Sequence, residues 1–133
     1  MTDQAAGDGA PVIVVLPEEI DVANVGKLHE LLNPAILSGA RVVVADLSAT
    51  EFCDAAGVRQ LVKIRHEAAA CGVRLRLAIP PGRLLRRTLV IMRADRLLPV
   101  YSTTQEAARL IAAPQDSPSI TKPRSGGQPE STW

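Results

Sequence analysis

The segment Asp46-Leu-Ser-Ala-Thr-Glu-Phe-Cys-Asp-Ala-Ala-Gly-Val58 joins two stretches of different pattern and decides the fold. The residues before it, Arg41-Val-Val-Val-Ala45, are rich in β-branched side chains, which is typical of a buried strand. After it, apolar residues recur every three or four positions between Val58 and Ala70, which predicts a helix. The sequence therefore predicts a strand, a loop, and a helix that begins near the carboxyl end of the strand.

Asp54 is well placed to begin this helix. Its carboxylate can accept hydrogen bonds from the free amides of the first turn, at the positive end of the helix dipole. Capping alone would account for Asp54, and close packing alone would account for Ala55, Ala56 and Gly57. The residue types by themselves leave a structural role and a binding role open.

Four stretches resemble, in the required order, the motifs of STAS domains, the family of bacterial anti-sigma factor antagonists. The stretches are Leu16–Asp21, Arg41–Ser48, Phe52–Val58 and Ala70–Leu77. The family patterns that they resemble are L-x-G-E-[LIV]-D, v-v-x-D-L-s, F-x-D-S-x-G-[LV] and a-x-G-g-x-l-x-l, respectively. The resemblance covers roughly residues 12–112. Two departures stand out, because Ala55 occupies the position of the family's phosphorylatable serine and Glu18 replaces the turn glycine.

Length and composition limit the class of protein. A chain of 133 residues is expected to form one domain, and a net charge of +1 favours neither a nucleic-acid-binding stripe nor an acidic tail. One Phe, one Tyr and one Trp make no stacking platform for bases, so the core must be aliphatic. No apolar run approaches the roughly 20 residues of a membrane span, and the first residues lack a signal pattern, so a cytoplasmic location is expected.

Four strands are expected. Pro11–Leu16 is apolar on both faces, which favours a central place in the sheet, and the strand at 41–45 follows it. Val73–Ile79 alternates polar and apolar residues, as in a strand with one partly exposed face. Leu97–Tyr101 contains Pro99 and is expected at an edge.

Four helices are expected between these strands. The first spans Val22–Leu37, with a kink or break at Pro34, and the second runs from about 55 to 71. The third spans Arg83–Met92. The last begins at the capping box Thr103-Thr-Gln-Glu106 and reaches about residue 112.

This alternation predicts an α/β fold. With the resemblance, the expectation is a STAS-like single domain over residues 12–112, with an about four-stranded mixed sheet and about four helices packed mainly on one side. The polar, Pro- and Gly-rich ends at 1–11 and 113–133 are predicted to be a disordered lead and tail.

No catalytic, cofactor or metal site is expected, so the protein is predicted not to be an enzyme. Cys53 and Cys71 flank the central helix, which would separate them by about 24 Å, whereas a disulfide needs Cα atoms within about 7 Å. A disulfide between two chains at Cys53 stays open. His29 is expected on a polar helix face, and the basic cluster of Arg83, Arg86 and Arg87 is best explained as a solvated face.

The resemblance implies a regulatory binding protein in bacterial transcription. Such antagonists bind an anti-sigma factor with an ATPase-like kinase domain and release a sigma factor, and the kinase partner switches this binding off by phosphorylating the loop serine. The residues implied for partner binding are Asp21, Asp54, Ala55, Ala56, Gly57 and Val58. Asp21 could instead cap the following helix.

Ala55 has no hydroxyl, so no phosphorylation is possible there; the nearest hydroxyls, on Ser48 and Thr50, are also explained by capping. The chain is expected to be a monomer or weak homodimer that binds no nucleic acid and has no membrane span. An alternative is a structural or assembly subunit of a transport or stress-signalling complex. A third interpretation is a nucleotide-binding version of the domain.

Overall fold

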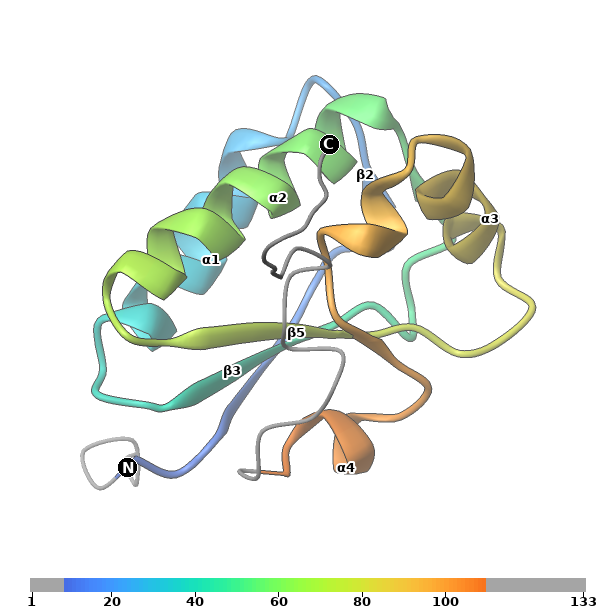
Figure 1. The fold of residues 1–133 in the computed structure, drawn as a ribbon. Helices are drawn as coiled ribbons and strands as arrows, with labels where there is room; N and C mark the ends of the chain where they lie inside the picture. The colour runs from blue at the N-terminus through green and yellow to red at the C-terminus, as the bar shows by residue number, and fades with distance from the viewer. Residues whose placement is uncertain (1–8, 110–133) are drawn as a thin grey trace, which may run out of the picture.

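A parallel sheet forms the centre of the computed structural model, which describes residues 9–109 (Figure 1). Its strands lie in the order β1-β3-β5-β6, and each neighbouring pair is parallel. The strands are β1 (Val12–Val15), β3 (Val42–Asp46), β5 (Arg74–Ala78) and β6 (Val100–Tyr101). A second, two-stranded sheet pairs β2 (Glu19–Ile20) with β4 (Phe52–Cys53), also in parallel.

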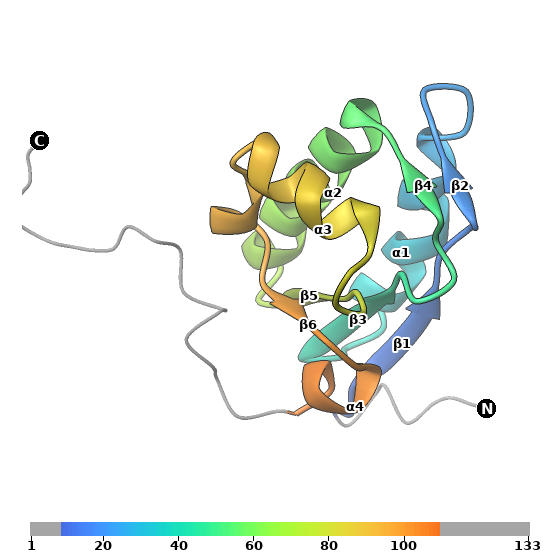
Figure 2. The ribbon, with the colours of Figure 1, turned by 90° about the vertical axis from the view of Figure 1, so that its right-hand side faces the viewer.

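Three helices cover one face of the four-stranded sheet, and one short helix lies on the other (Figures 1 and 2). Those on the covered face are α1 (Gly26–Ile36), α2 (Ala55–Ala70) and α3 (Leu84–Ile91), with the 3-10 turn η2 (Ala94–Arg96) after α3. On the opposite face lies α4 (Thr104–Ala107). The predicted fold class is thus confirmed, with every described strand pair parallel where a mixed sheet was expected.

Strand β3 is the central strand of the core. Its side chains alternate between two clusters, so Val43 and Ala45 join the large core under α1, α2 and α3. Val42 and Val44 point the other way and pack with Ala107 of α4. Burial on both faces explains why this strand is an uninterrupted run of apolar residues.

The prediction that the first strand is central is wrong. Strand β1 is an edge of the described sheet, and Ile13 and Val15 are 48% and 63% exposed. Val12 and Val14 pack against the large core. The apolar character of both faces suggested burial on both sides, but within residues 9–109 the helix on the far face, α4, joins the cluster of β3, β5 and β6 and not β1.

The predicted partly exposed face of β5 is also wrong at Arg76, which is 1% exposed. Its Nη1 donates to the carbonyl of Ala107 at 2.9 Å and also to that of Arg109. The guanidinium lies 5.6 Å from the centre of the Tyr101 ring. The alternating pattern predicts an exposed side chain here, but α4, the residue Arg109 after it and β6 supply partners for the buried guanidinium.

Helix boundaries shift where local hydrogen bonds compete with the helix. Helix α1 begins later than predicted, because Asp21 and Asn24 close a turn through the amide of Asn24 and the carbonyl of Asp21 at 3.1 Å. Pro34 does not break α1 but lies in its last turn. Gly39, with φ of 96°, follows the helix end as predicted.

Both ends of the chain lie outside the residues that the structure describes. The predicted disordered tail at 113–133, most of the predicted lead at 1–11 and the predicted end of the last helix near residue 112 lie outside the described range. At residue 9 the chain already contacts the domain, since the Gly9 carbonyl accepts from the Arg41 amide at 3.5 Å. None of the helices between residues 9 and 109 is long and apolar enough to cross a bilayer.

Candidate functional site

The two-stranded sheet brings two distant loops together beyond the carboxyl end of the main sheet (Figure 2). Glu19 pairs with Phe52, and Ile20 pairs with Cys53. The ladder continues by one hydrogen bond, from the Asp54 amide to the Ile20 carbonyl at 3.0 Å. Asp21 and Asp54 therefore follow directly on adjacent strands, so the structure brings together the two predicted acidic site residues.

Asp54 begins α2 as the sequence predicted. Its backbone is extended, and its Oδ1 accepts from the Gly57 amide at 3.0 Å. Ala55 and Ala56 form the first turn and are half-buried. The outer side of this turn therefore carries methyl groups only, and its backbone can be approached closely.

Gly57 and Val58, in contrast, face the interior of the protein. A Cβ on Gly57 would lie 2.6 Å from Cys53 Sγ and 2.7 Å from Ile20 Cγ2, so β2 and β4 pack directly on the helix backbone here. Val58 is 1% exposed. These two predicted site residues support the turn from beneath and have almost no surface for a partner.

Asp21 caps the turn that precedes α1 and not the helix itself, since α1 begins at Gly26 with no side-chain cap. Its Oδ1 accepts from the amides of Ala23 at 2.9 Å and Asn24 at 3.2 Å. The Asn24 side chain returns a bond, since its Oδ1 accepts from the Asp21 amide at 2.9 Å. The half-buried carboxylate is thus held in one orientation beside Asp54.

Two exposed apolar side chains flank these carboxylates, and the sequence analysis did not assign them to the site. Phe52 is 46% exposed and Val22 is 74% exposed. Alternation in β4 could have identified Phe52, because Cys53 is buried and its neighbour must point outward. We call the residues Asp21, Val22, Phe52, Asp54, Ala55 and Ala56 the ribbon surface.

The charge around the ribbon surface is acidic. Glu18, Glu19 and Glu51 are exposed, and the Glu51 amide donates to the Glu18 carbonyl at 2.8 Å, so these loops lie side by side. Exposed apolar groups next to fixed carboxylates suit a protein partner with basic and apolar side chains.

Cys53 is a buried part of this ribbon. Its thiol donates to the Asp54 carbonyl at 3.7 Å, and burial, followed by the charge of Asp54, raises its pKa to about 12. Cys71 is exposed, and both cysteines are free, as predicted. A buried, protonated thiol does not favour the disulfide between chains that the sequence left open.

The hydroxyls near Ala55 have structural roles or lie apart from it. Thr50 is 2% exposed and its Oγ1 donates to the Pro17 carbonyl at 2.8 Å. Ser48 is exposed, and its amide donates to Asp46 Oδ1 at 3.0 Å.

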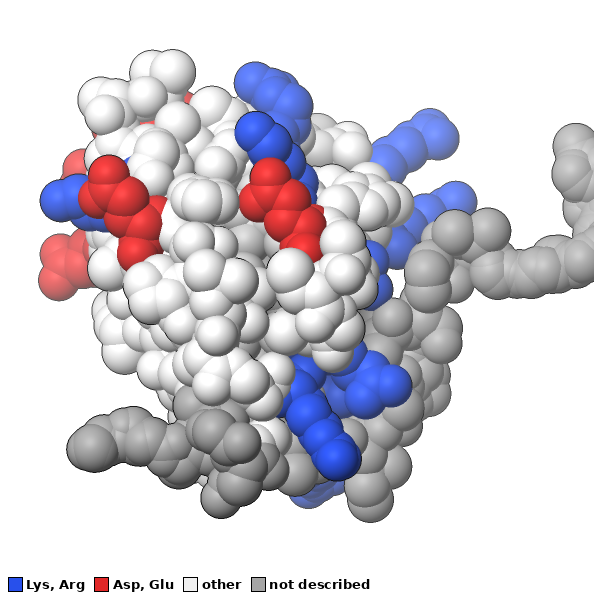
Figure 3. Space-filling model, turned by 90° about the vertical axis from the view of Figure 1, so that its left-hand side faces the viewer, with Lys and Arg blue, Asp and Glu red and all other residues white. Residues whose placement is uncertain are grey.

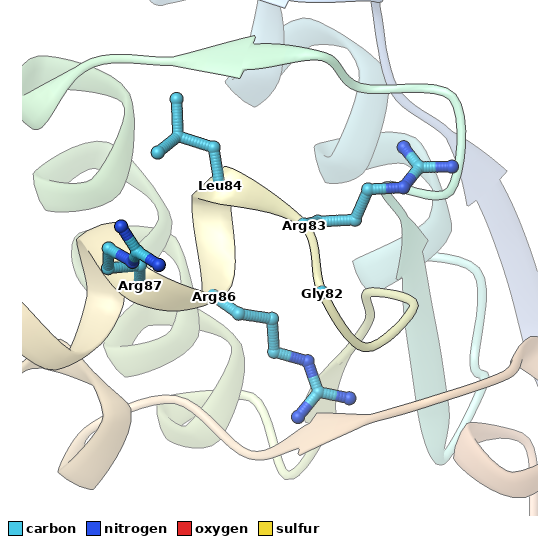
Figure 4. A pocket seen from close by; sticks show the side chains of 5 residues that line it. All are labelled: Gly82, Arg83, Leu84, Arg86 and Arg87. Atoms are coloured by element: carbon cyan, nitrogen blue, oxygen red, sulfur yellow. The ribbon is translucent and has the colours of Figure 1, made fainter.

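The basic cluster lines a hollow of about 350 Å³ at the start of α3 (Figure 4). Arg86 is engaged structurally, because its Nε and Nη2 donate to the Ile79 carbonyl at 2.9 and 2.7 Å. In Figure 4, Arg83, Arg86 and Arg87 point in different directions. Their guanidinium groups do not converge on one point, so the hollow lacks the geometry of an anion site.

A further pair of titratable side chains joins α1 to α2. His29 lies 3.5 Å from Glu67, and both side chains are nearly half exposed. No cluster of three potential metal-ligating side chains occurs within residues 9–109. The side of the molecule in Figure 3 carries both acidic and basic groups, some of them next to one another, so no single charge dominates it.

The fold and site together define an α/β domain with a loop-and-helix surface beyond the carboxyl end of its sheet. Residues 4–107 match the family model of the STAS domain, so the chain belongs to the STAS domain family. A search of curated proteins finds no match.

Solved structures share this fold at low sequence identity. The NMR structure of the protein TM1081 has a TM-score of 0.60 and 23% identity, covering 73% of this chain and 78% of that one. A crystal structure of a putative anti-sigma factor antagonist from Thermotoga maritima has a TM-score of 0.59 and 20% identity over 73% and 88%. The unphosphorylated anti-sigma factor antagonist SpoIIAA has a TM-score of 0.58 and 17% identity over 74% and 85%.

Proposed function

We propose that this STAS domain is a regulatory binding protein that acts as an anti-sigma factor antagonist. Its partner would be an anti-sigma factor with a kinase-type ATPase domain, and binding would release a sigma factor. Membership of the STAS family and the shared fold with two anti-sigma factor antagonists support this role.

The observation that carries the proposal is the first turn of α2. Asp54 is fixed by the Gly57 amide, and Ala55 and Ala56 lie on the outer side of the turn. Asp21, Val22 and Phe52 extend this surface. Gly57 and Val58 contribute by supporting the turn from the core, which revises their predicted role from contact to support.

Ala55 would make the contact insensitive to a kinase. A phosphoryl group adds about −1.5 to −2 charges, and at position 55 it would stand beside Asp54 and near Asp21. Without a hydroxyl this charge cannot be added there. The protein would therefore bind its partner as a permanently unphosphorylated antagonist does.

Substitution of Ala55 tests the proposal. Anti-sigma factors and ATPase-like kinases of the source organism would be titrated calorimetrically with the wild-type protein and with Ala55→Ser and Ala55→Glu. The serine variant should bind like the wild type until it is phosphorylated. The glutamate variant should bind at least about tenfold more weakly, a loss of about 1.4 kcal/mol.

A matched control separates local from general charge effects. Ala69→Glu adds the same charge to an exposed position near the far end of α2 and should leave binding unchanged. Glutamate in the first turn of a helix is favourable for the helix dipole, so Ala55→Glu is expected to fold. Unchanged affinity in a folded Ala55→Glu variant would refute this contact surface. Capture of transporter subunits instead of an anti-sigma factor would favour an assembly role.

A further inference from the structure

A second surface of the domain lies between α2 and the end of α3. It is a groove of about 510 Å³, open to solvent, which we call the α2–η2 groove. Its lining residues are Val58, Arg59, Val62, Lys63, His66, Glu67, Met92, Ala94 and Leu97. Figures 1 and 2 show η2 and α3 beside α2.

The floor of the groove is apolar. Val62 and Met92 are partly buried and pack against the large core, whereas Leu97 is 46% exposed. An apolar floor that is open to solvent in this way is a mark of an interaction site.

The rim of the groove is basic on balance. Arg59, Lys63 and His66 project from α2 at helical spacing, and the only carboxylate among the lining residues is that of Glu67. Glu67 is already occupied by His29 at 3.5 Å. Neither Arg59 nor Lys63 forms an ion pair with another residue of the described range 9–109, so both charges are available to a partner.

We propose that the α2–η2 groove binds an amphipathic helix of a protein partner, with apolar residues against Val62, Met92 and Leu97 and acidic residues facing the basic rim. Helices bind apolar grooves through residues at i, i+3, i+4 and i+7, and charges along the edge set the specificity. The open form suits a helix better than a small ligand, which would need an enclosed site. A concave floor also fits a helix better than the flat surface of a membrane.

A designed peptide tests this without knowledge of the natural partner. The probe is a fluorescein-labelled peptide of about 18 residues, about 27 Å of helix, with leucines along one face and glutamates beside them. Fluorescence anisotropy should show saturable binding to the full-length chain. A peptide of the same composition in scrambled order, and one with lysine in place of glutamate, should each bind at least about tenfold more weakly.

Substitutions inside and outside the groove show where the peptide binds. Leu97→Asp and Lys63→Glu should each lower the affinity for the peptide at least about fivefold, because each introduces a carboxylate into the groove. The matched controls are Leu37→Asp, at a side chain that is 68% exposed, and Lys27→Glu, on the exposed side of α1. Both should bind within about twofold of the wild type, and thermal melts should show that all four variants are folded. Affinity should also fall between about 50 and 300 mM salt, because the rim charges are screened.

Three results would overturn the proposal. One is equal binding of the ordered and scrambled peptides, or equal binding by Leu97→Asp and Leu37→Asp. Another is tight binding to anionic lipid vesicles that Leu97→Asp abolishes, which would assign the groove to a membrane. The third is a dimer in sedimentation experiments that Leu97→Asp dissociates, which would assign it to a second copy of this chain. Since the probe is no anti-sigma factor, the outcome is independent of the proposed function.

Discussion

Gly57 is the residue at which the fold leaves no space for a side chain. The Gly57→Ala substitution should destabilise the domain by about 1–3 kcal/mol, because its Cβ must displace Cys53 or Ile20 in a packed core. Urea denaturation followed by circular dichroism measures this change.

Gly26 provides the matched control for Gly57. A Cβ there meets no atom within 4 Å, so Gly26→Ala at the start of α1 should be neutral or stabilising by up to about 1 kcal/mol. Equal effects of the two substitutions would contradict the close packing of β2 and β4 on α2.

The two cysteines should differ sharply in reactivity. At neutral pH a disulfide reagent such as DTNB should modify Cys71 quickly and Cys53 only after unfolding, because the Cys53 thiol is buried and its pKa is about 12. In a Cys71→Ser variant the fast phase should disappear. A fast phase that persists in this variant would show that the β2–β4 sheet opens and exposes the Cys53 thiol.

The raised pKa of Cys53 also determines the direction in which the stability of the fold changes with pH. The thiol pKa rises from 9.0 in the unfolded reference to about 12 in the fold, so the unfolded state loses the proton first as pH increases. Stability from this group is complete below pH 9.0 and declines between 9.0 and about 12. Cys53→Ala should therefore make the stability curve flatter over that range.

At the scale of elements, α2 depends on its cap. Asp54→Ala removes the acceptor of the Gly57 amide and should cost about 0.5–2 kcal/mol, whereas Asp54→Asn should retain most of the stability. Denaturant titration of both variants measures the difference. If Asp54→Asn loses as much stability as Asp54→Ala, then the charge of Asp54, and not its hydrogen bond, is what mainly stabilises the start of α2.

Helix α4 is attached to the sheet through Arg76. Arg76→Ala leaves carbonyls of the last described residues without their donor and should destabilise the fold by about 2–4 kcal/mol. Hydrogen exchange should show lost protection first at the amides of Ala107 and Ala108. Arg74→Ala, exposed on the same strand, should stay within about 1 kcal/mol.

Local chemistry explains which elements could be predicted from the sequence. The cap at Asp54 and the capping box at Thr103 depend on neighbours within one helical turn, and both are present: the Thr103 hydroxyl accepts from the Glu106 amide at 3.1 Å. The place of β1 and the burial of Arg76 depend on where α4 packs, which no local pattern contains. For the same reason the apolar pattern around Val12–Val15 correctly predicted a strand but could not predict its place at the edge of the sheet.

The candidate site was predicted in part for a related reason. Asp21 and Asp54 meet because β2 pairs with β4, a contact that the family resemblance implied and that no spacing in the chain reveals. Gly57 and Val58 belong to the same motif but serve the core. A family motif contains both residues that bind a partner and residues that support them from the core. The burial of each residue is needed to separate the two groups.

For the whole molecule, the prediction that the end segments lie outside the domain remains to be tested. A chain of residues 9–113 should keep the thermal midpoint of the full-length protein. Its first residue is chosen because the Gly9 carbonyl bonds to Arg41. A midpoint lower by many degrees would show that one of the removed segments packs on the domain.

The attachment of Arg76 to α4 has a consequence for synthesis on the ribosome. Arg76 lies in the middle of the sheet, yet its acceptors at Ala107 and Arg109 are among the last described residues to be made. Every strand pair is also separated by a crossover, so no pair can form early from neighbouring sequence. A nascent chain that ends before α4 lacks two acceptors of the Arg76 guanidinium at the point where the sheet must close, so these contacts form only when the last described turn has left the exit tunnel.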